Sequence, residues 1–188
     1  MRTLIALATL AFAAGASAEP LSYAFDKVHS QLHASVNHMG LSNSTARFHV
    51  KDGTISFDTA DWSTAKVDVI LDVAGIDLGD ATWQEHVSAE KWFNVAGFPE
   101  ARFVSTKVEK TGDKTMKIHG DLTLKGATLP VTLDATLNQA GPHPFSKKPA
   151  IGVSATGTIQ RSKFGISEYL GGISDDVQIR IEIEASAG

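Results

Sequence analysis

The sequence predicts an all-β protein: a closed antiparallel barrel of about eight strands with one amphipathic helix packed at its side or mouth. Apolar and polar residues alternate with a period of two along most of the chain, which is typical of strands with one dry face. Short turn signals separate these strands and favour antiparallel hairpins. Because exposed sheet edges promote aggregation, a long sheet with one apolar face must fold over or close.

The candidate strands follow from this alternation and from the turn residues between them. Val177, Ile179 and Ile181 in the last strand, for example, face one way, while Gln178 and Arg180 face the other. Dipeptides such as Asp-Gly at 52–53 and Lys-Gly at 125–126 mark turns. The predicted strands span residues 22–28, 31–38, 46–50, 54–57, 66–73, 101–108, 116–124, 128–137, 151–161 and 177–185.

One segment departs from the alternation and predicts the helix. Thr82 and Glu85 have the spacing of a capping box, in which the two side chains satisfy free amides at a helix start. Trp83 and Val87 then fall on one side of a helix over residues 82–93, and Pro99 follows its end. The helix is expected to act as a packing element, as a lid over a cavity mouth, or as both.

The first 18 residues are expected to lie outside this fold. Arg2 is followed by an apolar run over residues 4–14 and by the small residues Ala16, Ser17 and Ala18. This pattern indicates a signal peptide over residues 1–18 and a periplasmic domain over residues 19–188. The apolar run is shorter than the roughly 20 residues that span a bilayer, so stable membrane insertion is not expected. The chain has no cysteine for a disulfide or a lipid anchor.

Charge and motifs exclude several classes of function. The net charge is −4 without a basic cluster, which argues against nucleic acid as a partner. The seven histidines are spread so that His29 and His33 share one strand face while His38 lies on the other. The sequence also lacks a metalloprotease motif, a nucleophile elbow and a phosphate-binding glycine loop. Neither a metal nor another cofactor is therefore expected.

The sizes of the inward residues predict an unfilled, elongated apolar cavity. An eight-stranded barrel is just wide enough to be filled by side chains or to hold one small ligand. A two-sheet sandwich would use the same residues for its core and is the structural alternative. The small inward candidates are Ala34, Val36, Val67, Val69, Val131, Ala135, Val153, Ala155 and Gly157.

Two polar residues end inward-facing strands. His38 follows the row formed by Leu32, Ala34 and Val36, and either hydrogen-bonds to loop backbone or places a polar group at the cavity neck. Arg161 follows another inward strand and serves either as an anchor for loop carbonyls or as a partner for an anionic head group. Its fork geometry suits both tasks.

The order and spacing of several motifs resemble the YceI-like family over nearly the whole mature chain. The motifs are Asp26-x-x-His29-Ser30, His38-Met39-Gly40, Trp83-x-Glu85-His86, Trp92-Phe93, Phe98-Pro99, Phe103-x-Ser105, Gly120-x-Leu122-Thr123-Leu124-Lys125-Gly126, Arg161-Ser162-x-Phe164-Gly165 and Ser174-Asp175. The resemblance implies an exported lipocalin-like barrel that encloses long-chain isoprenoid lipids, such as polyprenyl phosphates or isoprenoid quinones, without catalysing a reaction. Ala34 stands where the family usually has a bulky residue, often Phe, and Ala46 stands where Gly is common.

The expected function is periplasmic binding and carriage or storage of such a lipid. The alternatives are a fatty acid-type amphiphile as ligand, an enzyme that acts on the lipid through His38, His86 and Arg161, and a structural barrel with a filled core. A homodimer through an exposed edge or helix face stays open. The residues expected to contact the ligand are Val36, His38, Phe48, Phe57, Val69, Leu71, Trp92, Phe93, Leu122, Leu133, Val153 and Arg161.

Overall fold

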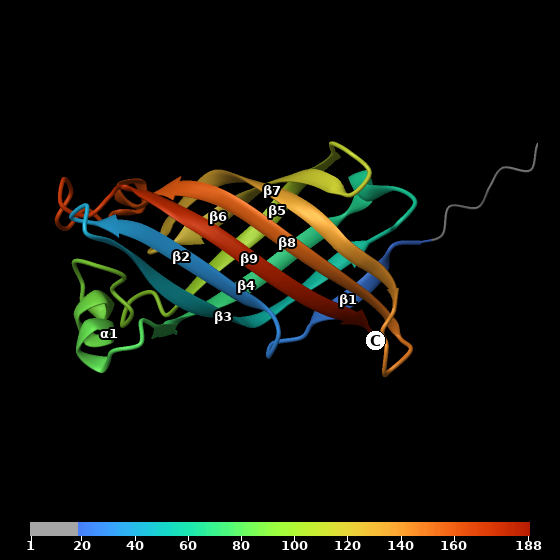
Figure 1. Cartoon of the computed structure of the whole chain (residues 1–188), viewed down its shortest axis with the longest axis horizontal. Coiled ribbons are helices and arrows are strands. Elements are labelled where there is room, and N and C mark those ends of the chain that lie inside the picture. The colour runs from blue at the N-terminus through green and yellow to red at the C-terminus, as the bar shows by residue number, and fades with distance from the viewer. Residues whose placement is uncertain (1–18) are drawn as a thin grey trace, which may run out of the picture.

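The protein is an elongated antiparallel barrel, shown in Figure 1. The structure, a computed structural model, describes residues 19–188, so the predicted signal peptide lies outside the described residues. The strands are β1 (Leu21–Phe25), β2 (Gln31–His38), β3 (Ser42–Phe57), β4 (Lys66–Asp77), β5 (Glu100–Lys110), β6 (Thr115–Leu124), β7 (Ala127–Pro142), β8 (Pro149–Gln160) and β9 (Asp176–Ala187). The helix α1 spans Ala81–Ser88, and η1 (Trp62–Thr64) and η2 (Arg161–Phe164) are short 3-10 helices.

The sheet closes because β3 pairs with β4 on one side and with β1 and β2 on the other. Strands β4 to β9 follow in hairpin order, and β9 pairs in turn with both β1 and β2. Strands β1 and β2 occupy one position in the barrel, which gives eight positions. The predicted closed barrel is confirmed, and the sandwich alternative is wrong because no pair of open sheets exists among the described strands.

A turn that begins at Asp26 separates β1 from β2. The Asp26 carboxylate accepts hydrogen bonds from the backbone N–H groups of Val28 (2.9 Å) and His29 (3.1 Å), which makes an Asx turn. The predicted strand over 22–28 therefore ends three residues early, at Phe25. Buried Ser30 then bridges to β9, because its hydroxyl donates to the carbonyl of Glu184 at 3.0 Å.

The prediction of two strands, 46–50 and 54–57, with a turn at residues 52–53 is wrong, because β3 is one continuous strand. The chain runs straight through this dipeptide, with a shift in the register to β4 between Val50 and Asp52. Gly53 has φ +144°, and a Cβ built on it would lie 2.4 Å from the carbonyl oxygen of Asp68 on β4. Glycine therefore serves here for close approach of two backbones at a β-bulge rather than for a hairpin turn.

We expect Gly53→Ala to lower the free energy of unfolding by about 2 kcal/mol or more, because the added methyl group meets a backbone carbonyl at a positive φ. Urea denaturation measures the change. Gly152→Ala on β8 is the matched control, since the nearest atom to its added Cβ lies at 3.7 Å. Equal unfolding midpoints for the two variants would contradict this account of the bulge.

Helix α1 begins earlier and ends sooner than predicted. Its N-cap is Asp80, whose carboxylate accepts a hydrogen bond from the backbone N–H of Trp83 at 2.9 Å. The predicted start at the Thr82 capping box is wrong because Asp80, an equally good cap, precedes it. Trp92 and Phe93 lie in turns after the helix. Among residues 19–188, no helix combines the length and apolarity needed to cross a membrane.

The barrel has two different ends. The η1 end holds η1 and the turns β5–β6 and β7–β8, and buried Trp62 packs there against Phe57 with ring centroids 5.7 Å apart. Lys110 lies over the face of this indole, with its Nζ 4.6 Å from the ring centroid. The α1 end holds α1, the turns β2–β3 and β6–β7, and the loop from η2 to β9 (Figure 1). Apolar packing of Trp62 against Phe57 therefore covers part of the η1 end.

Candidate functional site

An apolar cavity of about 410 Å³ lies inside the barrel. This volume is within the range of roughly 300–1,000 Å³ that is usual for small-ligand sites. All nine described strands contribute side chains to its wall, and α1 and the turns after it complete the wall at the α1 end. The interior of this barrel therefore contains a cavity and is not a filled core.

The cavity stays open because the side chains in the middle of the barrel are small or kept to the wall. Val131, Val153 and Ile181 face inward and yet keep intermediate accessibility, because they border empty space rather than each other. Gly120 on β6 lets the ring of Phe103 lie flat against the wall: a Cβ on Gly120 would be 2.4 Å from Phe103 Cζ. The open cavity that the small size of the inward residues predicts thus agrees with the structure.

Two of the small inward candidates do not line the cavity. Ala135 is fully covered in the packed wall. Gly157 lies under Leu133, whose Cδ2 would be 2.8 Å from an added Cβ. Their small size makes room for neighbouring side chains rather than for a ligand.

The structure places all twelve predicted ligand-contact residues on the wall of this one cavity, although they come from six strands, the turns after α1 and η2. Their contact with a ligand remains a prediction. They are Val36, His38, Phe48, Phe57, Val69, Leu71, Trp92, Phe93, Leu122, Leu133, Val153 and Arg161.

Sequence reasoning left out other parts of the wall. Ile179, Ile181 and Ile183 of β9 also line the cavity, and their alternation in the sequence was a usable signal for it. Met39 and Tyr169 line it from loops, where no periodic pattern could have marked them.

Aromatic side chains after α1 form the wall at the α1 end. The ring of Phe93 meets Phe48 of β3 edge to face, with centroids 5.8 Å apart. Trp92 lies between His86 of α1 and Tyr169 of the η2–β9 loop, with centroid distances of 5.6 and 6.2 Å. The helix and its following turns thus join the barrel at its end and cover part of the cavity.

The cavity opens at the α1 end. Among the wall residues in the described part of the chain, three are solvent-exposed, namely Met39, His86 and Tyr169, and all three lie at this end. Two polar wall residues, His38 at the end of β2 and Ser44 near the beginning of β3, lie at this end too. A ligand with a long apolar tail would therefore enter tail first and leave a polar head near the mouth.

Arg161 supports the loop at this end from inside. Its side chain is 4% exposed and donates to three backbone carbonyls: Nε to Ser174 at 2.9 Å, Nη1 to Ile166 at 2.9 Å and Nη2 to Ile173 at 3.0 Å. Burial lowers the pKa of the guanidinium, and the negative charge of Asp175 opposes that shift. Of the two predicted roles, the geometry shows the carbonyl anchor; contact with a head group stays a prediction.

Asp175 fixes the beginning of η2 to the same loop. Its carboxylate accepts hydrogen bonds from the backbone N–H (2.8 Å) and the hydroxyl (2.7 Å) of Ser162. These bonds hold the pKa of Asp175 below its ordinary value. The loop from η2 to β9 is therefore tied down at both its start and its end.

A cluster of Asp26, His29 and Glu184 brings possible ligand atoms within 4.8 Å of one another at the break between β1 and β2. His29 Nδ1 lies 2.9 Å from the Asp26 carboxylate, and this hydrogen bond raises the pKa of His29 and lowers that of Asp26. The Asx turn at Asp26 and the exposed Asp26–His29 pair explain why Asp26 and His29 lie close together in this cluster. Sequence spacing could not have brought Glu184 into it, because β9 is remote in the chain.

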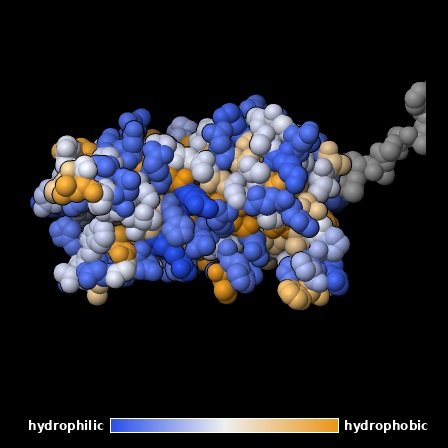
Figure 2. All heavy atoms as spheres, viewed as in Figure 1, coloured by the Kyte–Doolittle hydropathy of each residue, from blue (hydrophilic) through white to orange (hydrophobic). Residues whose placement is uncertain are grey.

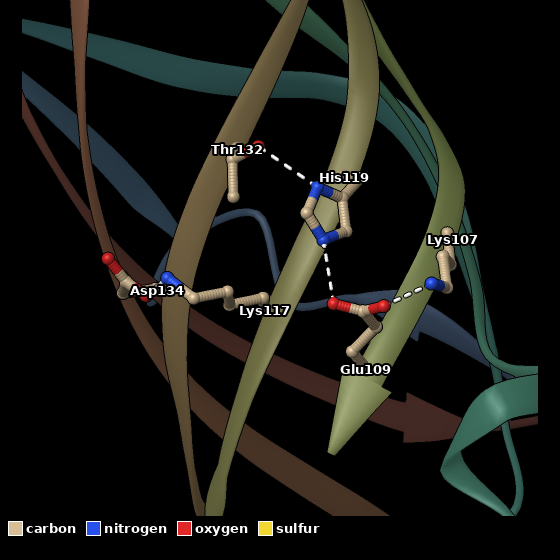
Figure 3. A network of polar contacts seen from close by, with 6 residues as sticks. All are labelled: Lys107, Glu109, Lys117, His119, Thr132 and Asp134. Atoms are coloured by element: carbon tan, nitrogen blue, oxygen red, sulfur yellow. Dashed lines mark hydrogen bonds and ion pairs between the residues drawn. The ribbon is translucent and has the colours of Figure 1, made fainter. Parts of the chain in front are cut away.

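A polar network on the outer face of β5, β6 and β7 also places a histidine between a hydroxyl and a carboxylate (Figure 3). His119 Nδ1 lies 3.0 Å from Thr132 Oγ1, and its Nε2 lies 3.2 Å from Glu109 Oε2. Hydrogen bonds from Lys107 and then from His119 lower the pKa of Glu109. The residues labelled in Figure 3 are not part of the cavity wall, so the network links strands on the outside.

A closed antiparallel barrel with an apolar cavity open at one end defines a lipocalin-like binding protein. The chain belongs to the YceI-like family, whose domain it matches over residues 23–185. The resemblance seen in its motifs is thereby confirmed.

Relatives and solved structures agree with this assignment. The protein YceI of Salmonella arizonae is 38% identical over 180 residues, which cover 95% of this chain and 93% of the relative. The crystal structure of Burkholderia cenocepacia BcnA superposes with a TM-score of 0.76 at 25% identity and covers 86% of this chain and 99% of its own. A polyisoprenoid binding domain from Saccharophagus degradans shares the fold, with a TM-score of 0.70 at 16% identity over 89% of this chain and 99% of that one.

Proposed function

We propose that the protein binds a long-chain isoprenoid lipid, of the polyprenyl phosphate or isoprenoid quinone type, and carries or stores it in the periplasm without transforming it. The apolar cavity through the barrel is the observation that carries the proposal. Support comes from the related fold in Saccharophagus degradans that is described as a polyisoprenoid binding domain.

The physical case rests on the tail of the ligand. Each CH₂ group removed from water contributes about 0.8 kcal/mol, so a long tail in this cavity binds strongly without a hydrogen bond. The walls around the tail, such as Leu71, Leu133 and Val153, offer only apolar contacts. Selectivity then comes from the length of the cavity and from polar groups at its mouth.

The head group is expected at the α1 end, where His38 and His86 line the mouth. Buried Arg161 also lines the cavity at this end, with three of its N–H groups already donated to carbonyls. We expect this arrangement to hold and orient a head group. It offers no nucleophile poised beside a base among the wall residues of the described chain, which favours binding over catalysis.

Extraction of the protein with organic solvent tests the proposal. The protein is purified from the periplasmic fraction without added lipid, and the extract is identified by mass spectrometry before and after prolonged incubation. We expect one class of isoprenoid lipid, unchanged by incubation. A product that grows with time would show an enzyme instead, fatty acids alone would show the wrong ligand class, and an extract without lipid would overturn the proposal.

A further inference from the structure

Four exposed apolar side chains gather around the mouth of the cavity. Met39 and Leu41 belong to the β2–β3 turn, and Tyr169 and Leu170 belong to the η2–β9 loop; together these four residues are called the rim. Their exposed fractions run from 47% for Leu170 to 84% for Leu41. Figure 2 shows apolar side chains on the surface at the end of the barrel where Figure 1 places this turn and this loop.

Backbone hydrogen bonds hold the two halves of the rim together. Met39 N–H donates to the carbonyl of Gly172 at 2.6 Å, and Ser174 N–H donates to the carbonyl of Asn37 at 3.0 Å. A bridge between His38 and Ile173 adds to this pairing. The four apolar side chains therefore form one fixed surface.

The turn residues suggest that this surface is not a by-product of folding. Met39 and Gly40 both have positive φ, +56° and +72°, in the tight turn between β2 and β3. Turns of this kind favour Asn or Asp before Gly, because those side chains tolerate the left-handed region. Tyr169 likewise has φ +52°. Large apolar residues stand at two positions where local folding favours small polar ones.

The two segments that carry the rim contain few charged residues. The sequence has no Lys, Arg, Asp or Glu between Lys27 and Arg47, which covers all of β2 and the β2–β3 turn, and Glu168 is the single charge between residues 165 and 174. A partner recognised through ion pairs would find little to bind here. An apolar, uncharged partner fits.

The rim is also continuous with the cavity, because Met39 and Tyr169 are both exposed at the surface and part of the cavity wall. A ligand that enters the cavity at this end therefore passes close to Met39 and Tyr169. An apolar tail that leaves a membrane can then move from the bilayer to the cavity without crossing water.

We propose that the rim docks on the surface of a lipid bilayer, with the cavity mouth toward the membrane, and so admits the ligand. This inference rests on the proposed function, since a membrane lipid is the ligand that needs such a route. Insertion of the rim is shallow, as apolar residues on a small tip reach only the boundary between head groups and acyl chains.

Vesicle flotation tests the docking surface. The mature protein is mixed with phosphatidylcholine vesicles, and the fraction that floats is compared with that of Leu41→Ser/Leu170→Ser, whose residues are exposed but are not on the cavity wall. We expect floating protein to fall about fivefold or more with this loss of apolar area. Phe145→Ser, at a side chain 90% exposed on the η1 end, is the control and should float like the wild type.

Loading with geranylgeraniol separates this inference from the proposed function. Delivered from vesicles, the lipid should load the double variant more slowly than the wild type; delivered in ethanol, it should load both equally. Equal flotation and equal loading from vesicles would overturn the docking surface, as would a wild-type dimer that the double substitution dissociates. If the wild-type protein floats with the vesicles but takes up lipid by neither route, the proposed function is wrong, whereas the docking surface is still supported.

Discussion

Ala46→Trp is expected to empty the barrel of lipid while the protein stays folded. Ala46 faces the cavity from β3, and an indole at this position projects into the space that the tail would occupy. We expect the lipid recovered per mole of protein to fall about tenfold or more, because the new side chain and the tail compete for one cavity of limited volume. Stability should change by about 1 kcal/mol or less, since the indole enters empty space rather than a packed core.

The neighbouring residue supplies the control. Thr45 precedes Ala46 on β3 but points outward, where its hydroxyl lies 2.7 Å from that of Ser35. Thr45→Trp therefore adds the same side chain to the opposite face of the same strand and should leave the lipid content unchanged. An equal lipid content in the two variants would show that the cavity is not where the lipid lies.

Arg161→Met is expected to cause the largest loss of stability among substitutions at the α1 end. The buried guanidinium satisfies the carbonyls of Ser174, Ile166 and Ile173, and methionine leaves all three without a donor. We expect the free energy of unfolding to fall by about 3 kcal/mol, as measured by urea denaturation. Arg161→Lys should recover little of this, because an ammonium group lacks the planar fork.

A surface arginine gives the matched control. Arg180 on β9 is mostly exposed and pairs with Glu182 at 3.0 Å. Exposed ion pairs contribute about 0–1 kcal/mol, so Arg180→Met should shift the unfolding midpoint only slightly. If Arg161→Met were no more destabilising than Arg180→Met, the anchor role of Arg161 would be wrong.

The fold could be predicted from the sequence where it depends on side-chain parity, that is, on the alternation of inward and outward residues along a strand. Strand β2 has the predicted bounds, 31–38, and parity also predicts the cavity-facing side of β9. The prediction failed at Gly53, because an Asp-Gly dipeptide is a signal both for a hairpin turn and for a bulge. The choice between them depends on the close approach of Asp68 from β4, which is a long-range contact.

The site could be predicted in part for the same reason. Parity placed residues such as Val69 and Leu122 on the inner face, and the structure puts them on the cavity wall. It could not tell an open cavity from a packed core, since that depends on the diameter of the closed barrel. The partners of Arg161 are backbone carbonyls, which every residue carries, and the exposed positions of Met39 and Tyr169 depend on loop conformation.

Native mass spectrometry of the purified protein, without added lipid, is the most direct test of the central claim that the barrel encloses a long-chain isoprenoid lipid. We predict one bound lipid per chain, released by organic solvent and missing in Ala46→Trp. A wild-type protein that shows only the mass of the chain, and that still binds no isoprenoid lipid when one is supplied, would contradict the claim.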